Sequence, residues 1–141
     1  MSTKLSVEKE FTVRFSEVDA LAIVWHGNYL KYFEDGREAF GKKYEFDYLD
    51  TFNQGFVTPL VHVEMDYRRP LTYGDKAIVE TVFINSEAAK IIFDYTIKRA
   101  DTGEIVTKGN TVQIFLNSAR ELVLTSPEFF IEWKKRWGII Q

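Results

Sequence analysis

One short stretch, residues 15–29, brings together side chains that could carry out chemistry on a carbonyl group. Its acidic residue is Asp19, and His26 opens a His-Gly-Asn sequence at the start of a predicted helix. The free N–H groups at a helix start can polarise a carbonyl and favour developing negative charge. A carboxylate beside them can activate water or attack directly. Together these parts predict acyl transfer, although an Asp in such a loop often only stabilises a turn.

The elements that must position these residues are predicted from the spacing of apolar side chains. Alternation predicts a first strand over residues 4–15, and a wide apolar surface predicts one long helix over 28–41. Gly36 weakens that helix, which predicts that another element packs closely against it. A short helix with a turn is expected within 44–55, and a terminal helix over 127–137. The remaining predicted strands cover residues 57–67, 76–85, 90–99 and 105–117. This order indicates an α+β protein rather than an alternating α/β one.

Composition excludes several functional classes. The 141 residues are expected to form one domain, 1–141, and the net charge of −3 without a basic block argues against nucleic-acid binding. There is no cysteine, and the two histidines, His26 and His62, lack a metal-ligand spacing. We therefore expect neither a metal nor another cofactor. No apolar stretch is long enough to span a membrane, and the N-terminal residues lack a signal-like apolar region, so a cytoplasmic protein is expected.

The stretch from Arg14 to Glu34 resembles the signature of 4-hydroxybenzoyl-CoA thioesterases and related acyl-CoA thioesterases. That signature runs through an aspartate, two apolar residues, an aromatic residue, His or Tyr, Asn-Tyr, and an aromatic-Glu pair. The matching residues here are Asp19, Ile23-Val24, Trp25, His26, Asn28-Tyr29 and Phe33-Glu34. A supporting match is Tyr67-Arg68-Arg69-Pro70, followed by Gly74-Asp75.

The resemblance implies the hotdog fold, in which a five-stranded antiparallel sheet wraps a long central helix. It also implies a homodimer or homotetramer with active sites at the dimer interface. Asp19 would be the catalytic carboxylate that hydrolyses an acyl-CoA thioester, and the backbone N–H of His26 would polarise the thioester carbonyl. Gly27 and Asn28 form the same helix start and, with Tyr29, are candidate substrate-binding residues.

Two further groups of residues bear on the substrate. Leu21 and Ala22 stand where many relatives have glycines, so their side chains could narrow or reshape the acyl pocket. Arg68 and Lys90 are candidates for contacts with the phosphates of CoA, because phosphate recognition favours Arg and Lys.

Two other functions fit parts of the pattern. A hotdog hydratase or dehydratase would pair a carboxylate with a histidine at a shorter spacing than the six residues between Asp19 and His26, which favours a thioesterase. A non-catalytic acyl-ligand binder or sensor is disfavoured by the carboxylate beside the helix start. Glu17, two residues before Asp19, is interpreted as a solvated loop charge rather than a second acid.

Overall fold

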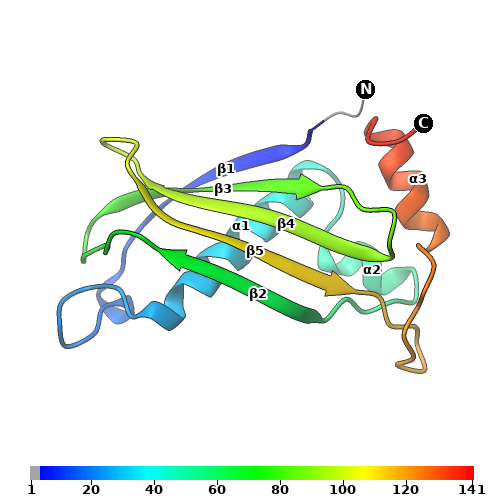
Figure 1. The fold of residues 1–141 in the computed structure, drawn as a ribbon, viewed down its shortest axis with the longest axis horizontal. Helices are drawn as coiled ribbons and strands as arrows, with labels where there is room; N and C mark the ends of the chain where they lie inside the picture. Colours follow the sequence, from blue (N-terminus) through cyan, green and yellow to red (C-terminus); the bar gives the residue numbers. More distant parts are fainter. Residues whose placement is uncertain (1–3) are drawn as a thin grey trace.

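The computed structural model describes residues 4–141, which form a five-stranded antiparallel sheet and three α-helices (Figure 1). The helices are α1 (Tyr29–Lys43), α2 (Tyr48–Asn53) and α3 (Glu128–Arg136). The strands are β1 (Ser6–Thr12), β2 (Leu60–Tyr67), β3 (Lys76–Ile84), β4 (Lys90–Arg99) and β5 (Ile105–Ile114). Two 3₁₀ helices, Phe15–Glu17 and His26–Asn28, lie between β1 and α1. The predicted α+β class is confirmed.

The sheet has the strand order β1-β3-β4-β5-β2, and each pair of neighbours is antiparallel. β2 follows the helical segment in the chain but pairs with β5, at the edge of the sheet opposite β1. α1 packs mainly on β1, β3 and β4. The helix therefore covers the β1 side of the sheet more fully than the β2 side.

The close packing predicted at Gly36 is confirmed. α1 turns its apolar face to the sheet, and Phe33 and Phe40 are fully buried there. Gly36 lies against β3, where a Cβ would overlap the Thr81 hydroxyl and approach Val79 Cγ2 to 3.1 Å. Only a residue without a side chain lets the helix and the strand come this close.

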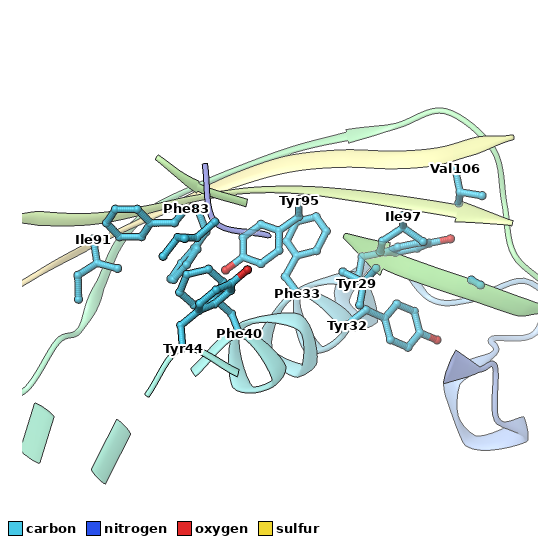
Figure 2. Packing of buried hydrophobic residues seen from close by; sticks show 14 of the residues in the cluster. Tyr29, Tyr32, Phe33, Phe40, Tyr44, Phe83, Ile91, Tyr95, Ile97 and Val106 are labelled. Carbon is cyan, nitrogen blue, oxygen red and sulfur yellow. The ribbon is translucent and has the colours of Figure 1, made fainter. Parts of the chain in front are cut away.

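Aromatic rings fill the space between α1 and the sheet (Figure 2). The rings of Phe33 and Tyr95 stack with centroids 4.4 Å apart. α3 closes the end of this core near α2, where Trp133 is buried and its Nε1 donates to the Tyr44 carbonyl at 2.7 Å. Aromatic pairs with such geometry add to the stabilisation from area burial.

Two predicted strands end earlier than expected. The first was expected to reach Phe15, but β1 ends at Thr12 and Phe15 begins a 3₁₀ helix with 73% of its surface exposed. The Val13 carbonyl accepts from the N–H of Gly74, in the turn before β3, at 3.0 Å. The chain therefore leaves the ladder of hydrogen bonds between β1 and β3 at this point. β5 ends at Ile114 rather than Asn117. Within residues 4–141, no helix is long and apolar enough to cross a membrane.

Candidate active site

Asp19 lies on a tight hairpin turn between the two 3₁₀ helices. Its main-chain N–H donates to the Ile23 carbonyl and its carbonyl accepts from the Ala22 N–H, both at 2.9 Å. Its carboxylate oxygen Oδ1 accepts from the Leu21 N–H at 2.8 Å. Ala22 has a φ of 66°, a left-handed conformation that a side chain disfavours. The turn thus holds the carboxylate half-buried in one orientation, beside the exposed side chain of Leu21.

The hairpin is anchored on both sides. The N–H of Val24 donates to the Leu71 carbonyl at 2.8 Å, in the loop that follows β2. The next N–H, that of Trp25, donates to the Glu17 carbonyl at 3.0 Å. The segment therefore leads directly from the Asp19 turn to the helix start. In Figure 1 this loop (blue) lies at the end of α1 opposite α2 and α3.

His26 begins the 3₁₀ helix that runs into the fifteen-residue helix α1. The N–H groups of His26 and Gly27 stand at this start, where a helix offers no partner from an earlier turn. A Cβ at Gly27 would overlap the Trp25 indole, so the ring lies directly against the glycine. The His26 carbonyl is held by the Tyr67 hydroxyl, which donates to it at 2.8 Å. Fixed N–H groups with the helix dipole behind them favour a developing negative charge.

Asn28 and Tyr29 lie beneath this helix start, with only 7% and 3% of their surfaces exposed. Asn28 Nδ2 donates to the Glu17 carbonyl at 2.9 Å. The Tyr29 ring packs edge-on against Tyr67, with centroids 5.2 Å apart, and burial raises the pKa of its phenol. Through these contacts both side chains support the helix start. Their contact with the substrate stays a prediction.

The interpretation of Glu17 as a solvated charge is wrong. Its surface is 9% exposed, and its carboxylate Oε1 accepts from the Arg14 N–H at 2.8 Å and from the Tyr32 hydroxyl at 3.1 Å. Burial, with the neighbouring Glu17 carboxylate, raises the pKa of Tyr32 well above its usual value. The sequence did not reveal this contact because Tyr32 lies fifteen residues further along the chain.

The two basic candidates are not brought together within one chain. Arg68 follows β2 at the end near His26, where its N–H donates to the Val106 carbonyl and its Nε donates to Asp66 at 2.9 Å. Lys90 begins β4 and pairs with Ile114. Val106 and Ile114 are eight residues apart on β5, which separates the two basic side chains by about 26 Å along the sheet.

A cleft of about 730 Å³ lies beside the second half of α1, between that helix, α2 and the nearby ends of β2, β4 and β5. Its apolar lining comes from Phe46, Tyr48, Leu49, Leu60, Ile91 and Phe93. The charged residues Glu34 and Arg37 of α1 border it. Asp19 is not among the residues that line this cleft, so within one chain the carboxylate and the cleft are separate. Among residues 4–141 no cluster of His, Asp or Glu could hold a metal ion.

Fold and site together define a class: a hotdog protein with an aspartate on the turn that leads into the N-terminal end of the central helix. Residues 13–134 match the Thioesterase-like superfamily, to which the chain therefore belongs. It is 32% identical over 126 residues to a Bacillus subtilis protein with the provisional name acyl-CoA thioesterase YneP, covering 89% of this chain and 91% of that protein. The expectation of a hotdog thioesterase, an enzyme that hydrolyses thioesters, is confirmed.

Two further comparisons agree. A 1,4-dihydroxy-2-naphthoyl-CoA hydrolase of Nostoc punctiforme is 26% identical over 125 residues, covering 86% of this chain and 82% of that protein. The crystal structure of a DHNA-CoA thioesterase from Staphylococcus aureus superposes with a TM-score of 0.83 at 25% identity, covering 94% of this chain and 88% of that one. These relatives favour hydrolysis over the hydratase and binder alternatives.

Proposed function

We propose that this thioesterase hydrolyses acyl-CoA thioesters with Asp19 as its reacting carboxylate and the His26 N–H as the donor to the thioester carbonyl. One observation carries the proposal: next to the Asp19 hairpin, the Glu17 carbonyl accepts from the N–H of Trp25, the residue immediately before His26. Carboxylate and helix start are thereby held in one rigid segment. The names of the relatives, which act on acyl-CoA or naphthoyl-CoA thioesters, support the same substrate class.

The chemistry follows from these two groups. The thioester oxygen lies on the N–H groups of His26 and Gly27, which stabilise it as negative charge develops. In one route Asp19 takes a proton from water, hydroxide adds to the carbonyl carbon, the C–S bond breaks, and the CoA thiolate takes the proton. In the other route an Asp19 oxygen attacks the carbon itself, the C–S bond breaks and the CoA thiolate leaves. Water then hydrolyses the resulting mixed anhydride, which returns the Asp19 carboxylate and supplies the proton for the thiolate. Both routes release a free acid and CoA and use no metal.

The acyl group and the assembly form the second part of the proposal. β2 is an exposed edge strand with apolar Val61 and Val63, which are 54% and 41% exposed. Antiparallel pairing of β2 with β2 of a second copy would place the Tyr67 end of one strand beside the Leu60 end of the other. Tyr67 contacts His26, whereas Leu60 lines the cleft.

Such a dimer sets the helix start and Asp19 of one copy over the apolar cleft of its partner, which would take the acyl group. It also brings Lys90 of one copy to the same end of the joined sheet as Arg68 of the other, where both could bind CoA phosphates. Pairing of dimers into a tetramer is compatible with this arrangement.

The test is release of free thiol from a panel of aliphatic and aromatic acyl-CoAs, with a chelator present throughout. The Asp19→Asn variant keeps the shape of the side chain but is neither a base nor a good nucleophile, so we expect kcat to fall by about 10²–10⁴. Asp94→Asn is the matched control, because Asp94 is an exposed carboxylate on β4. Activity of Asp19→Asn within about threefold of wild type, against a loss of about 10² for a missing base, would contradict the assignment.

A further inference from the structure

Glu17 has no part in the proposed reaction, yet it is a buried carboxylate two residues from Asp19. Moving a charged group out of water is costly unless hydrogen bonds compensate. The Glu17 side chain receives two such bonds, from the Arg14 N–H at 2.8 Å and from the Tyr32 hydroxyl at 3.1 Å. The Arg14 guanidinium adds a longer contact of 3.7 Å from an exposed position. An apolar residue of similar size could fill the same space, so the burial of a carboxylate here needs a reason.

The two ends of Glu17 bond to α1 and to the segment that leads into it. Its carboxylate bonds Tyr32, one turn into α1, and Tyr32 lies at the edge of the aromatic cluster in Figure 2. Its main-chain carbonyl accepts from the Trp25 N–H at 3.0 Å and from Asn28 Nδ2 at 2.9 Å. Trp25 and Asn28 flank His26 and Gly27, the two residues whose N–H groups face the substrate in the proposed function.

We propose that Glu17 is a positioning residue that fixes the Asp19 carboxylate relative to the N–H groups of His26 and Gly27. This inference rests on the proposed function of Asp19. Val18, next to Glu17, bridges Val24 across the hairpin, so a shift of Glu17 displaces Asp19 and the helix start relative to each other. The bond to Tyr32 prevents that shift because Tyr32 belongs to α1 and is itself buried, stacking on Phe11 at 4.2 Å between ring centroids.

The experiment compares three substitutions. In Glu17→Gln the amide oxygen still accepts from both the Arg14 N–H and the Tyr32 hydroxyl, so we expect kcat within about threefold of wild type. Glu17→Ala removes the acceptor, and we expect kcat to fall roughly 10- to 100-fold with KM nearly unchanged, since a misplacement of about 1 Å can cost that much. Tyr32→Phe removes only the hydrogen-bond donor and should lower kcat less than Glu17→Ala does. Because the two side chains share one interaction, the double variant should have a kcat only slightly below that of Glu17→Ala.

Amide hydrogen exchange provides a readout that does not depend on activity. In Glu17→Ala, residues 19–28 should exchange faster while the strands of the sheet keep their protection, and in Glu17→Gln the same residues should stay protected. Glu10→Gln is the matched control, because Glu10 is an exposed glutamate on β1, and it should change neither kcat nor exchange.

Three results would overturn the proposal. The first is a folded Glu17→Ala enzyme with the kcat and the exchange pattern of wild type. The second is a Glu17→Gln enzyme as slow as Glu17→Ala, since the negative charge would then take part in the reaction itself. The third is a loss of protection spread evenly over the sheet, which would make Glu17 a support of the whole fold. Full activity of Asp19→Asn is a separate result that refutes the proposed function, so the two failures can be told apart.

Discussion

At the scale of single residues, the fold buries two charged side chains in different ways. Glu17 receives two hydrogen-bond donors near the active-site hairpin. Lys134 of α3 is 4% exposed and donates to the Ser86 carbonyl at 2.9 Å, with its ammonium 4.5 Å from the centre of the Phe130 ring. It takes part in none of the ion pairs formed among residues 4–141. Burial therefore lowers the pKa of Lys134 below 10.5.

This pKa predicts a pH-dependent stability. The folded protein binds the Lys134 proton less tightly than the unfolded chain, so its stability rises as the pH increases toward 10.5. Lys134→Met lacks this contribution. As the pH rises toward 10.5, urea unfolding should show wild type gaining stability relative to the variant. The exposed Lys135→Met is the control and should show no such trend. A constant difference between wild type and Lys134→Met as the pH rises would contradict the prediction.

The sequence placed Asp19 on the loop before the helix start, as in the structure, because a carboxylate, a His-Gly-Asn segment and a helical pattern are close in the chain. The catalytic role of Asp19 stays a prediction. It missed the contact of Glu17 with Tyr32, which lies 15 positions away in the chain. It also missed the contact of Tyr67 with the His26 carbonyl, which lies 41 positions away. Local patterns predict which side chains sit on one face of an element. They do not predict which polar group from another element will meet a loop residue.

At the scale of elements, α1 illustrates how packing overrides intrinsic propensity. An alanine at position 36 would improve helix propensity by about 1 kcal/mol. Its Cβ would, however, overlap the Thr81 hydroxyl, and Thr81 is fully buried with no hydrogen-bond partner for that hydroxyl among the described residues. Overpacking of a core typically costs about 1–3 kcal/mol. The packing cost is thus at least as large as the gain in propensity.

We therefore expect Gly36→Ala to lower the free energy of unfolding by up to about 2 kcal/mol, measured by urea denaturation at fixed protein concentration. Adding Thr81→Ala removes the oxygen that the new methyl group meets, and it should restore part of the loss. Ala39→Gly, also on α1, measures the propensity term by itself. A Gly36→Ala protein more stable than wild type would show that propensity prevails at this position.

At the scale of the whole molecule, the sequence predicted the number of strands but not their order. Alternation placed Val61, Val63, Met65 and Tyr67 on one face of β2. It could not reveal that β2 crosses to the edge opposite β1, because pairing between distant strands leaves no local pattern. As a result, this apolar face is partly exposed, and the apolar cleft beside α1 and α2 lies apart from Asp19. Both features have one explanation if a second copy pairs with β2.

A shared active site makes a quantitative prediction for mixed dimers. Asp19→Asn removes the carboxylate, and Leu49→Arg places a long charged side chain at the apolar cleft, where Leu49 is 61% exposed. Each variant alone should be nearly inactive. When the two variants are co-expressed in equal amounts, half of the dimers should be mixed. Each mixed dimer contains one site with an intact Asp19 from one copy and an intact cleft from the other. Random pairing should therefore restore about a quarter of the wild-type activity.

The control removes the pairing of copies. Val63→Asp puts a charge on β2 that meets its equivalent across the two-fold axis, and like charges facing each other across paired strands are destabilising. Light scattering should show this variant as a monomer with little activity, while Thr12→Asp on the opposite edge strand should leave the assembly intact. If the mixed dimers stay inactive, the carboxylate and the cleft of the working site belong to the same chain. A fully active Val63→Asp monomer would refute the dimer itself.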